Sequence, residues 1–207
     1  MKLIVLNGPP RSGKDTIGNM LGSLGDDIYV TKFAIPLKQM AHRLLGINDV
    51  DYDSFDDVKD KPHDDFHGLT PREFYIGLSE QFIKPMLGQG FLGSMLVRDI
   101  IREAEERSGT GRKLNYVVVT DSGFKPELLR LVDEFGAQNM LLCHIFRPNT
   151  NFIGDSRRYI RRGGIRKVEI GNGKGIAQLR ASTAQALSQV PDYEHLAERV
   201  RSGGKCS

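Results

Sequence analysis

Four short, largely apolar runs and a fifth segment with strand-like character, 166–170, alternate along the chain with longer stretches whose apolar residues recur at the spacing of an amphipathic helix. The third and fourth runs are almost continuously apolar, which is typical of buried strands, and the β-branched third run is typical of a central parallel strand. The predicted strands are 2–6, 28–33, 114–121, 140–146 and 166–170. The predicted helices are 14–24, 34–45, 70–87, 91–107, 126–135, 176–190 and 192–200. This alternation predicts a three-layer α/β fold, with a five-stranded, mostly parallel sheet between two layers of helices.

The loop after the first predicted strand carries the most specific motif. Gly8 and Gly13 bound this loop and Lys14 follows it, which meets the spacing G-x-x-x-x-G-K of a phosphate-binding P-loop. Glycines permit the positive φ and close approach by which backbone N–H groups surround phosphate oxygens, and the next helix adds further N–H donors. A chance glycine-rich turn is the alternative, but the flanking strand and helix favour the P-loop. The predicted triphosphate-binding residues are Gly8, Arg11, Ser12, Gly13, Lys14, Asp15 and Thr16.

One position departs from the usual motif. Asp15 stands where a Ser or Thr hydroxyl normally reaches Mg²⁺, and Thr16 comes one place later. A carboxylate adds negative charge near phosphate, so we expect Mg²⁺ or its water shell to lie between them. Asp121 ends the third predicted strand, at the edge where open α/β sheets bind ligands, and is a further candidate for Mg²⁺. Its alternative role is to cap the helix that follows.

Residues 47–68 form an acidic insertion between two predicted helices. Its eight aspartates are at positions 49, 51, 53, 56, 57, 60, 64 and 65. Their spacing lacks the glycine and glutamate of a calcium-binding loop. A flexible surface insertion is the first interpretation, and a segment that orders when substrate binds is the second. Arg72 follows at the start of the next predicted helix, where it either binds a phosphate in a cleft or faces solvent.

In the stretch 147–167 the charge reverses, with seven basic residues and one acid, Asp155. Two interpretations compete. The stretch is either a nucleic-acid-binding patch, for which only Phe152 and Tyr159 are available to stack on bases, or an arginine-rich mobile lid. A lid, at about 148–164, would bring arginines over a transferring phosphoryl group. The preceding P-loop motif favours the lid.

Length and composition limit the remaining possibilities. The 207 residues are most simply a single domain, and a net charge of +3 is too small to argue for a nucleic-acid partner. Cys143 lies in an apolar run and Cys206 near the end of the chain, so we expect no structural disulfide and a reducing compartment. The first apolar run, of about five residues, is far too short for a signal sequence or a membrane span. We therefore expect a cytoplasmic protein with no membrane association.

In their order along the chain, these motifs resemble the T-even bacteriophage deoxynucleoside monophosphate kinases. The segments that carry the resemblance are 7–16, 34–38, 72–81, 117–122 with Glu127, 144–148 and 168–179. The Gly-Lys-Asp loop is moderately specific, and the order of the motifs adds to it. That family tends to have an arginine two positions after the strand-end aspartate, whereas this chain has Gly123, and the acidic insertion has no counterpart that we can match.

The resemblance implies a P-loop kinase that transfers the γ-phosphoryl group of ATP, with Mg²⁺, to a (deoxy)nucleoside monophosphate. The acceptor phosphate is already ionised at neutral pH, so no general base is needed and catalysis is positioning plus charge neutralisation. The implied catalytic residues are Lys14, Arg147, Arg157 and Arg158. The implied acceptor-binding residues are Lys38, Arg72 and Asp121, and the implied metal ligands are Asp15, Thr16 and Asp121.

Two other functions stay open at this point. One is a P-loop kinase for another small phosphorylated metabolite, and the other is an ATP-dependent nucleic-acid-binding protein that uses the basic stretch. On the first interpretation the partners are nucleotide substrates, with no nucleic acid and no membrane, and a homodimer stays open. The expected location is the cytoplasm, that of the host if the chain is phage-encoded.

Overall fold

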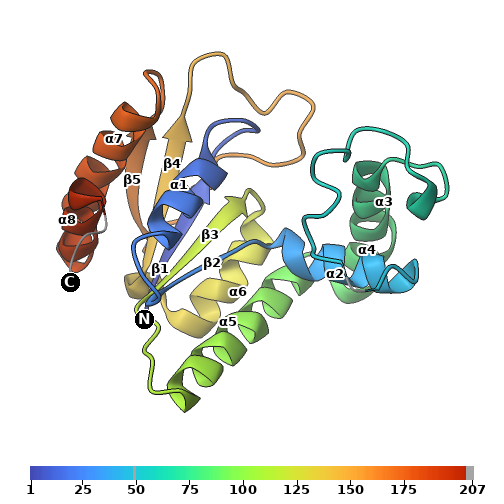
Figure 1. The fold of residues 1–207 in the computed structure, drawn as a ribbon, viewed down its shortest axis with the longest axis horizontal. Coiled ribbons are helices and arrows are strands. Elements are labelled where there is room, and N and C mark those ends of the chain that lie inside the picture. Colours follow the sequence, from blue (N-terminus) through green and yellow to red (C-terminus); the bar gives the residue numbers. More distant parts are fainter. Residues whose placement is uncertain (49, 204–207) are drawn as a thin grey trace.

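The sheet is the centre of the computed structural model, which describes residues 1–48 and 50–203 (Figure 1). Its five strands lie in the order β2-β3-β1-β4-β5, and each neighbouring pair is parallel. The strands are β1 (Lys2–Asn7), β2 (Ile28–Thr31), β3 (Tyr116–Ser122), β4 (Met140–Phe146) and β5 (Arg166–Gly171). The predicted five-stranded α/β fold is confirmed, and the sheet of the described residues is entirely rather than mostly parallel.

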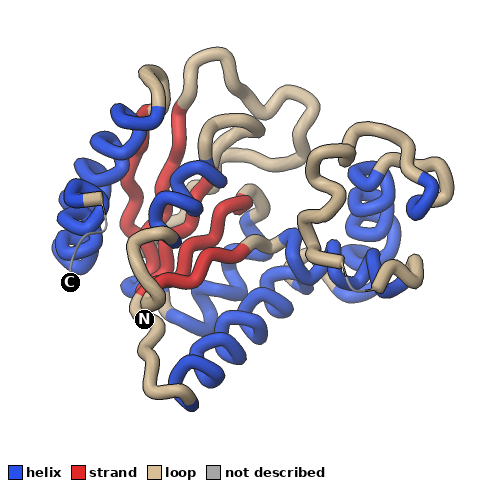
Figure 2. The backbone as a smooth tube through the Cα atoms, in the orientation of Figure 1, coloured by secondary structure: helices blue, strands red, loops and turns tan. Residues whose placement is uncertain are grey.

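Helices cover both faces of this sheet (Figures 1 and 2). One face carries α1 (Lys14–Gly22), α7 (Ile176–Ser188) and α8 (Glu194–Ser202), and the other carries α5 (Phe91–Gly109) and α6 (Lys125–Phe135). Successive residues of β1 point to opposite faces, so Ile4 and Leu6 pack in the first core while Leu3 and Val5 pack in the second. All four are fully buried, which explains the unbroken apolar run of this strand.

A lobe beside the sheet contains α2 (Ala34–Leu44), α3 (Pro71–Gly77) and α4 (Lys84–Leu87) (Figure 1). Thr70 and Glu73 form a reciprocal capping box at the start of α3. The single helix predicted for 70–87 is interrupted by a π-helical segment, η2 (Leu78–Ile83). Such segments are rare and frequently lie at functional sites. Three short 3₁₀ segments complete the described structure: η1 (Asp64–Phe66), η3 (Ala137–Asn139) and η4 (Pro191–Tyr193).

The acidic insertion has a packed interior, which its charge pattern alone does not predict. Phe55 and Phe66 are buried with Ala41 and Tyr75, and the two phenylalanine rings meet edge to face with centroids 5.0 Å apart. Two aromatic residues among the aspartates supply a core that the charge pattern conceals. Position 49, the first of the eight aspartates, lies outside the described residues.

The loops after β1 and β3 run to opposite faces of the sheet, because α1 covers one face and α6 the other. In an open parallel sheet this reversal creates a crevice at the carboxyl ends of the strands. The neighbouring strand end is closed: His144 is buried, with its Nε2 2.9 Å from the carbonyl oxygen of Ile160, as expected for a structural histidine. The crevice at β1 and β3 is thus the place to look for a site.

Two expectations from composition concern the rest of the molecule. Cys143 is free and buried, and burial raises the pKa of its thiol to about 12. Cys206 lies outside the described residues. Within the part of the chain that the structure describes, none of the helices combines the length and the apolar character that crossing a bilayer requires.

Candidate functional site

The glycine-bounded loop (residues 8–13) connects β1 to α1. A Cβ atom on Gly8 would lie 2.6 Å from Ser12 Oγ and 2.9 Å from the carbonyl oxygen of Ile145, so a side chain does not fit there. Gly13 has φ 102° and stands at the N-cap of α1, where no side chain caps the helix. The first N–H groups of α1 are therefore available to an anion held by the loop.

Two side chains from other loops donate hydrogen bonds to backbone carbonyl groups of this loop and hold it in position. Asn172 follows β5, and its Nδ2 donates to the carbonyl oxygen of Ser12 at 2.9 Å. Arg147 follows β4, and its Nη1 donates to the carbonyl oxygen of Arg11 at 2.8 Å. Arg147 thus stands at the loop, and its contact with a phosphate stays a prediction. Asn172 was missed as a site residue, although its position after a strand was a usable signal.

Lys14 lies inside the loop. Its Nζ donates to the carbonyl oxygens of Gly8 (2.8 Å) and Pro9 (2.7 Å), and only 7% of the residue is exposed. Burial, together with the positive charge of Arg157, lowers the pKa of Lys14 to about 8. A phosphate beside the ammonium would oppose both effects, so the arrangement favours an anion as the ligand.

Asp15, the irregular position of the motif, is paired. Lys32 Nζ lies 2.9 Å from Asp15 Oδ1, and Thr120 donates to the same oxygen at 3.3 Å. Burial is the largest single effect and opposes ionisation, but the hydrogen bonds from Lys32 and Thr120 and the charges of Lys32 and Lys14 together outweigh it and lower the pKa of Asp15. Lys32 follows β2 at the same sheet edge, which the sequence analysis overlooked. It supplies the positive charge that makes a carboxylate tolerable at this position.

Asp121 is a helix cap, although not of the helix expected. Its two carboxylate oxygens accept hydrogen bonds from the backbone N–H groups of Phe33 (2.7 Å) and Ala34 (2.9 Å), at the start of α2. The predicted cap of the following helix, α6, is not observed: its N-cap residue is Phe124, without a side-chain hydrogen bond. Burial raises the pKa of Asp121, although the hydrogen bonds from these two N–H groups lower it.

The three predicted metal ligands are not brought together as one set. Thr16 lines a different cavity from Asp121, and both oxygens of Asp121 are engaged with α2. Among the described residues no group of three or more His, Cys, Asp and Glu side chains is placed to hold an ion. Asp15 keeps one oxygen outside its ion pair and is largely exposed. The residues therefore fit a Mg²⁺ ion held mainly by phosphate and water, with Asp15 as the carboxylate.

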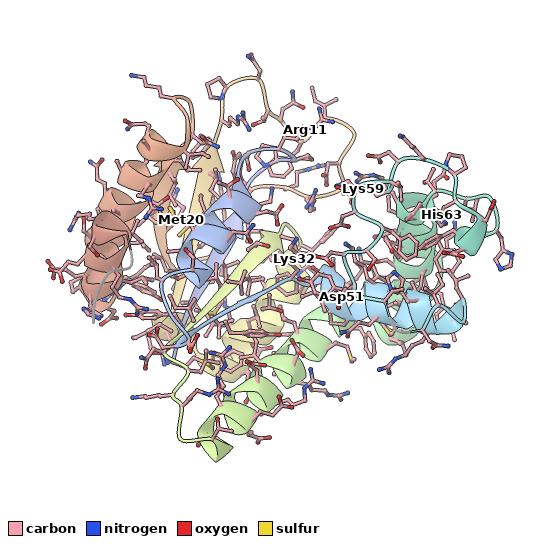
Figure 3. The ribbon with its side chains drawn as sticks, in the orientation of Figure 1. Arg11, Met20, Lys32, Asp51, Lys59 and His63 are labelled. Carbon is pink, nitrogen blue, oxygen red and sulfur yellow. The ribbon has the colours of Figure 1, made fainter. Side chains whose placement is uncertain are left out.

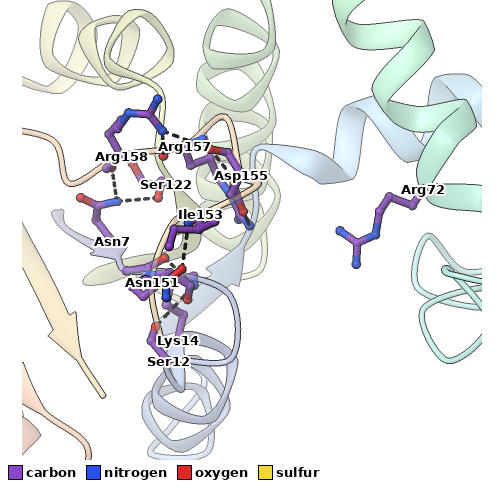
Figure 4. A network of polar contacts seen from close by, with 12 residues as sticks. Asn7, Ser12, Lys14, Arg72, Ser122, Asn151, Ile153, Asp155, Arg157 and Arg158 are labelled. Carbon is purple, nitrogen blue, oxygen red and sulfur yellow. Dashed lines mark hydrogen bonds and ion pairs between the residues drawn. The ribbon is translucent and has the colours of Figure 1, made fainter. Parts of the chain in front are cut away.

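The basic segment, which is the basic stretch 147–167, is anchored to the sheet edge by hydrogen bonds of Asn7, the last residue of β1. The Asn7 Nδ2 donates to the carbonyl oxygens of Ser122 (2.8 Å) and Arg158 (3.0 Å), and Oδ1 accepts from the backbone N–H of Ile160 (2.7 Å) (Figure 4). Ile160 is itself only 4% exposed, in the core between the sheet and α6. Residues 157–160 of the predicted lid are thus part of the folded body, and lid motion stays a prediction for the rest.

Replacing Asn7 by alanine should lower the free energy of unfolding by about 2–4 kcal/mol, because three backbone groups, two of them in buried hydrogen bonds, would lose a partner. Urea unfolding measures the change. Asn48→Ala is a matched control, since Asn48 is exposed and makes a single bond, to the carbonyl oxygen of Gly46, and should change stability by under about 0.5 kcal/mol. Equal effects of the two variants would contradict an anchoring role for Asn7.

Arg157 and Arg158 are adjacent in sequence but differ in position (Figure 4). The Arg157 stem packs directly over Gly123, where a Cβ would overlap it, and its guanidinium pairs with Asp155 at 2.6 Å. Charges of Lys14 and Arg157 influence each other, so this guanidinium lies near the loop. Arg158 is exposed and donates to the carbonyl oxygens of Asp155 and Arg157.

The basic residues predicted for the acceptor are paired with the acidic insertion. Lys38 forms an ion pair with Asp56, and Arg72 Nε lies 2.5 Å from Asp60. Figure 3 shows Lys59 of this insertion on the side of the glycine-bounded loop and His63 on the far side. Arg72 lines the cavity described next and Lys38 does not. Both residues stay predictions for acceptor binding.

Two cavities are lined by residues that contact or lie near the glycine-bounded loop, although residues 8–13 themselves line neither. The first, of about 330 Å³, lies between the sheet edge and the lobe, with Asp121 and Arg157 at one end and Arg72 at the other. The second, of about 270 Å³, is lined by Thr16, Arg147 and the loop after β5. Lys14 lines neither cavity, but its charge interacts with that of Arg157, which lines the first. Comparison with protein-family models and with curated proteins yields no match for this chain, so the interpretation rests on this geometry.

Proposed function

We propose that this protein is a phosphotransferase that moves the γ-phosphoryl group of ATP to a (deoxy)nucleoside monophosphate. The observation that carries the proposal is a buried lysine at an uncapped helix N-terminus, with a cavity beside each of two neighbouring arginines. Arg157, whose charge acts on Lys14, lines the first cavity, and Arg147, which bonds to the glycine-bounded loop, lines the second. A hydrolase or a simple nucleotide-binding protein needs one nucleotide cavity, whereas a transferase needs two that meet at the phosphoryl group. The resemblance in the order of the sequence motifs supports the same assignment.

The second cavity suits the nucleoside of the donor and the first suits the acceptor. The triphosphate then lies along the loop, where N–H groups of residues 8–14 and the Lys14 ammonium neutralise its charge. Arg157 comes from the acceptor side and Arg147 from the donor side of the loop, so cations reach the transferring group from both directions. Arg72, at the far end of the first cavity, holds a group of the acceptor after leaving Asp60.

The Mg²⁺ of MgATP supplies charge neutralisation between the outer phosphates, and Asp15 is the residue of this chain that would hold it or its water. Lys32 fixes the Asp15 carboxylate at the helix start through the 2.9 Å ion pair. No side chain is required to remove a proton, because the acceptor phosphate is ionised at neutral pH. The protein's contribution is to position two anions against each other and to balance their charge.

A coupled ADP-release assay tests the proposal. It uses MgATP as the donor and compares three sets of acceptors: the deoxynucleoside monophosphates, the ribonucleoside monophosphates and a set of small phosphorylated metabolites. We expect ADP release that depends on at least one nucleoside monophosphate, with the diphosphate as product. Turnover only with a non-nucleotide phosphometabolite would overturn the acceptor assignment. Salt-dependent DNA binding at micromolar protein, without acceptor-dependent turnover, would favour the nucleic-acid alternative instead.

A further inference from the structure

The first cavity is lined by both apolar and charged side chains, and two of its buried polar side chains have no partners among the described residues. Phe33, Leu37, Tyr75 and Phe124 are among its lining residues. Glu127 of α6 and Ser79 of the π-helical segment η2 are 3% and 6% exposed and also line it. Neither side chain makes a hydrogen bond or ion pair with any residue that the structure describes.

An unpaired buried carboxyl group is costly unless a ligand satisfies it. Neither Glu127 nor Ser79 is among the side chains whose polar atoms are fully enclosed without a partner, so their polar atoms remain reachable from the cavity. A pocket with apolar walls and a few convergent polar groups is the usual form of a site for a flat, partly polar ligand. A nucleobase has this chemistry, since its faces are apolar and its edge is polar.

We propose that Glu127, with Ser79 beside the same cavity, recognises the polar edge of the acceptor's base and so makes the protein select nucleotides over other phosphorylated metabolites. This inference rests on the proposed function and deepens it. A carboxyl group donates one hydrogen bond and accepts another when it is neutral. That pair of functions complements the adjacent donor and acceptor that every nucleobase carries on its pairing edge.

The surroundings of Glu127 favour the neutral carboxyl. Burial, with the negative charge of Asp121 as the second cause, raises the pKa of Glu127 to about 8. The charged groups that face Glu127 come from four elements: Asp121 of β3, Lys84 of α4, Glu80 of η2 and Arg157 of the basic segment. Lys84 is ion-paired with Glu80, and its Nζ lies 3.9 Å from the centre of the Phe124 ring. Because Lys84 bonds to Glu80 and not to Glu127, the Glu127 carboxyl group is available to a ligand.

The test measures KM of the acceptor, at saturating MgATP, for the wild type, Glu127→Ala and Glu127→Gln. The acceptors are the best nucleoside monophosphate and deoxyribose 5-phosphate, which has the same sugar and phosphate and no base. We expect Glu127→Ala to raise KM for the nucleotide by about tenfold to a hundredfold and to leave KM for deoxyribose 5-phosphate unchanged. Glu127→Gln also donates and accepts, so it should restore KM at pH 7.

The pH profile is a second measurement. Between pH 7 and pH 9 the wild-type KM should rise about tenfold as Glu127 ionises, and that of Glu127→Gln should not. Lys14 titrates in the same range in both proteins, so the ratio of their profiles isolates Glu127. An equal effect of Glu127→Ala on both acceptors, or parallel profiles, would overturn the inference and leave the proposed function standing. If no nucleoside monophosphate is bound or turned over, both are overturned.

Discussion

Replacing Lys14 by alanine should lower kcat/KM for phosphoryl transfer by at least about a thousandfold. Lys14 is the cation that the structure places within the glycine-bounded loop, where its Nζ is held by the carbonyl oxygens of Gly8 and Pro9. Because the ammonium is buried, no water is close enough to replace its charge fully when the variant binds a triphosphate. The coupled ADP-release assay measures the loss.

The control is Lys113→Ala, since Lys113 is exposed and makes no hydrogen bond or ion pair within the described residues. That variant should keep wild-type activity. The Lys14→Ala protein is expected to fold, because the substitution removes the free-energy cost of burying a charged ammonium group. Circular dichroism and thermal unfolding check that it folds. Unchanged phosphoryl transfer in a folded Lys14→Ala protein would refute the proposed function.

The position of Lys14 illustrates what the sequence predicts well. Spacing and flanking elements place the glycine-bounded loop at the start of α1, and the rule that ligands bind at the carboxyl ends of parallel strands brings Asp121 and Arg147 to the same edge. Applied to every strand, the same rule would also have indicated Lys32 after β2 and Asn172 after β5. These two residues were missed because a motif search attends to the motif and not to the sheet edge as a whole.

Other features depend on contacts between distant segments and could not be predicted from the pattern alone. Asp121 caps α2 because the turn at Phe33 and Ala34 lies beside β3, which no local spacing reveals. The ion pairs of Lys38 and Arg72 with the acidic insertion could not be predicted either, because they depend on where the insertion lies in the folded protein. The packed interior of the insertion was not predicted, because its charge was weighed and its two buried phenylalanines were not.

The two adjacent arginines of the basic stretch show most clearly that contacts between distant segments cannot be predicted from the sequence pattern. In the sequence Arg157 and Arg158 are equivalent members of a basic stretch, and only the contact with Gly123 distinguishes them. The absence of a side chain at position 123, which departs from the family pattern, creates the space that the Arg157 stem fills. A guanidinium from the basic stretch 147–167 thus lines the first cavity, the one proposed for the acceptor.

Arg157→Ala should therefore lower kcat by about a thousandfold, the size of effect typical of an arginine that neutralises a transferring phosphoryl group. KM for MgATP should change little, because the donor side of the loop keeps Lys14 and Arg147. Arg162→Ala is the control, since Arg162 is exposed and without a hydrogen bond or ion pair among the described residues. Steady-state kinetics at saturating acceptor separates kcat from KM.

Gly123→Ala tests the same residue without removing its charge. A Cβ at position 123 would overlap the Cβ, Cγ and Cδ atoms of Arg157, so the stem must move and carry the guanidinium with it. We expect kcat to fall by about a hundredfold while the protein still folds, because misplacement of a charged group by about 1 Å costs that much. A Gly123→Ala protein with wild-type kcat would show that the position of Arg157 does not matter to catalysis, and would shift the assignment to Arg147 or Arg158.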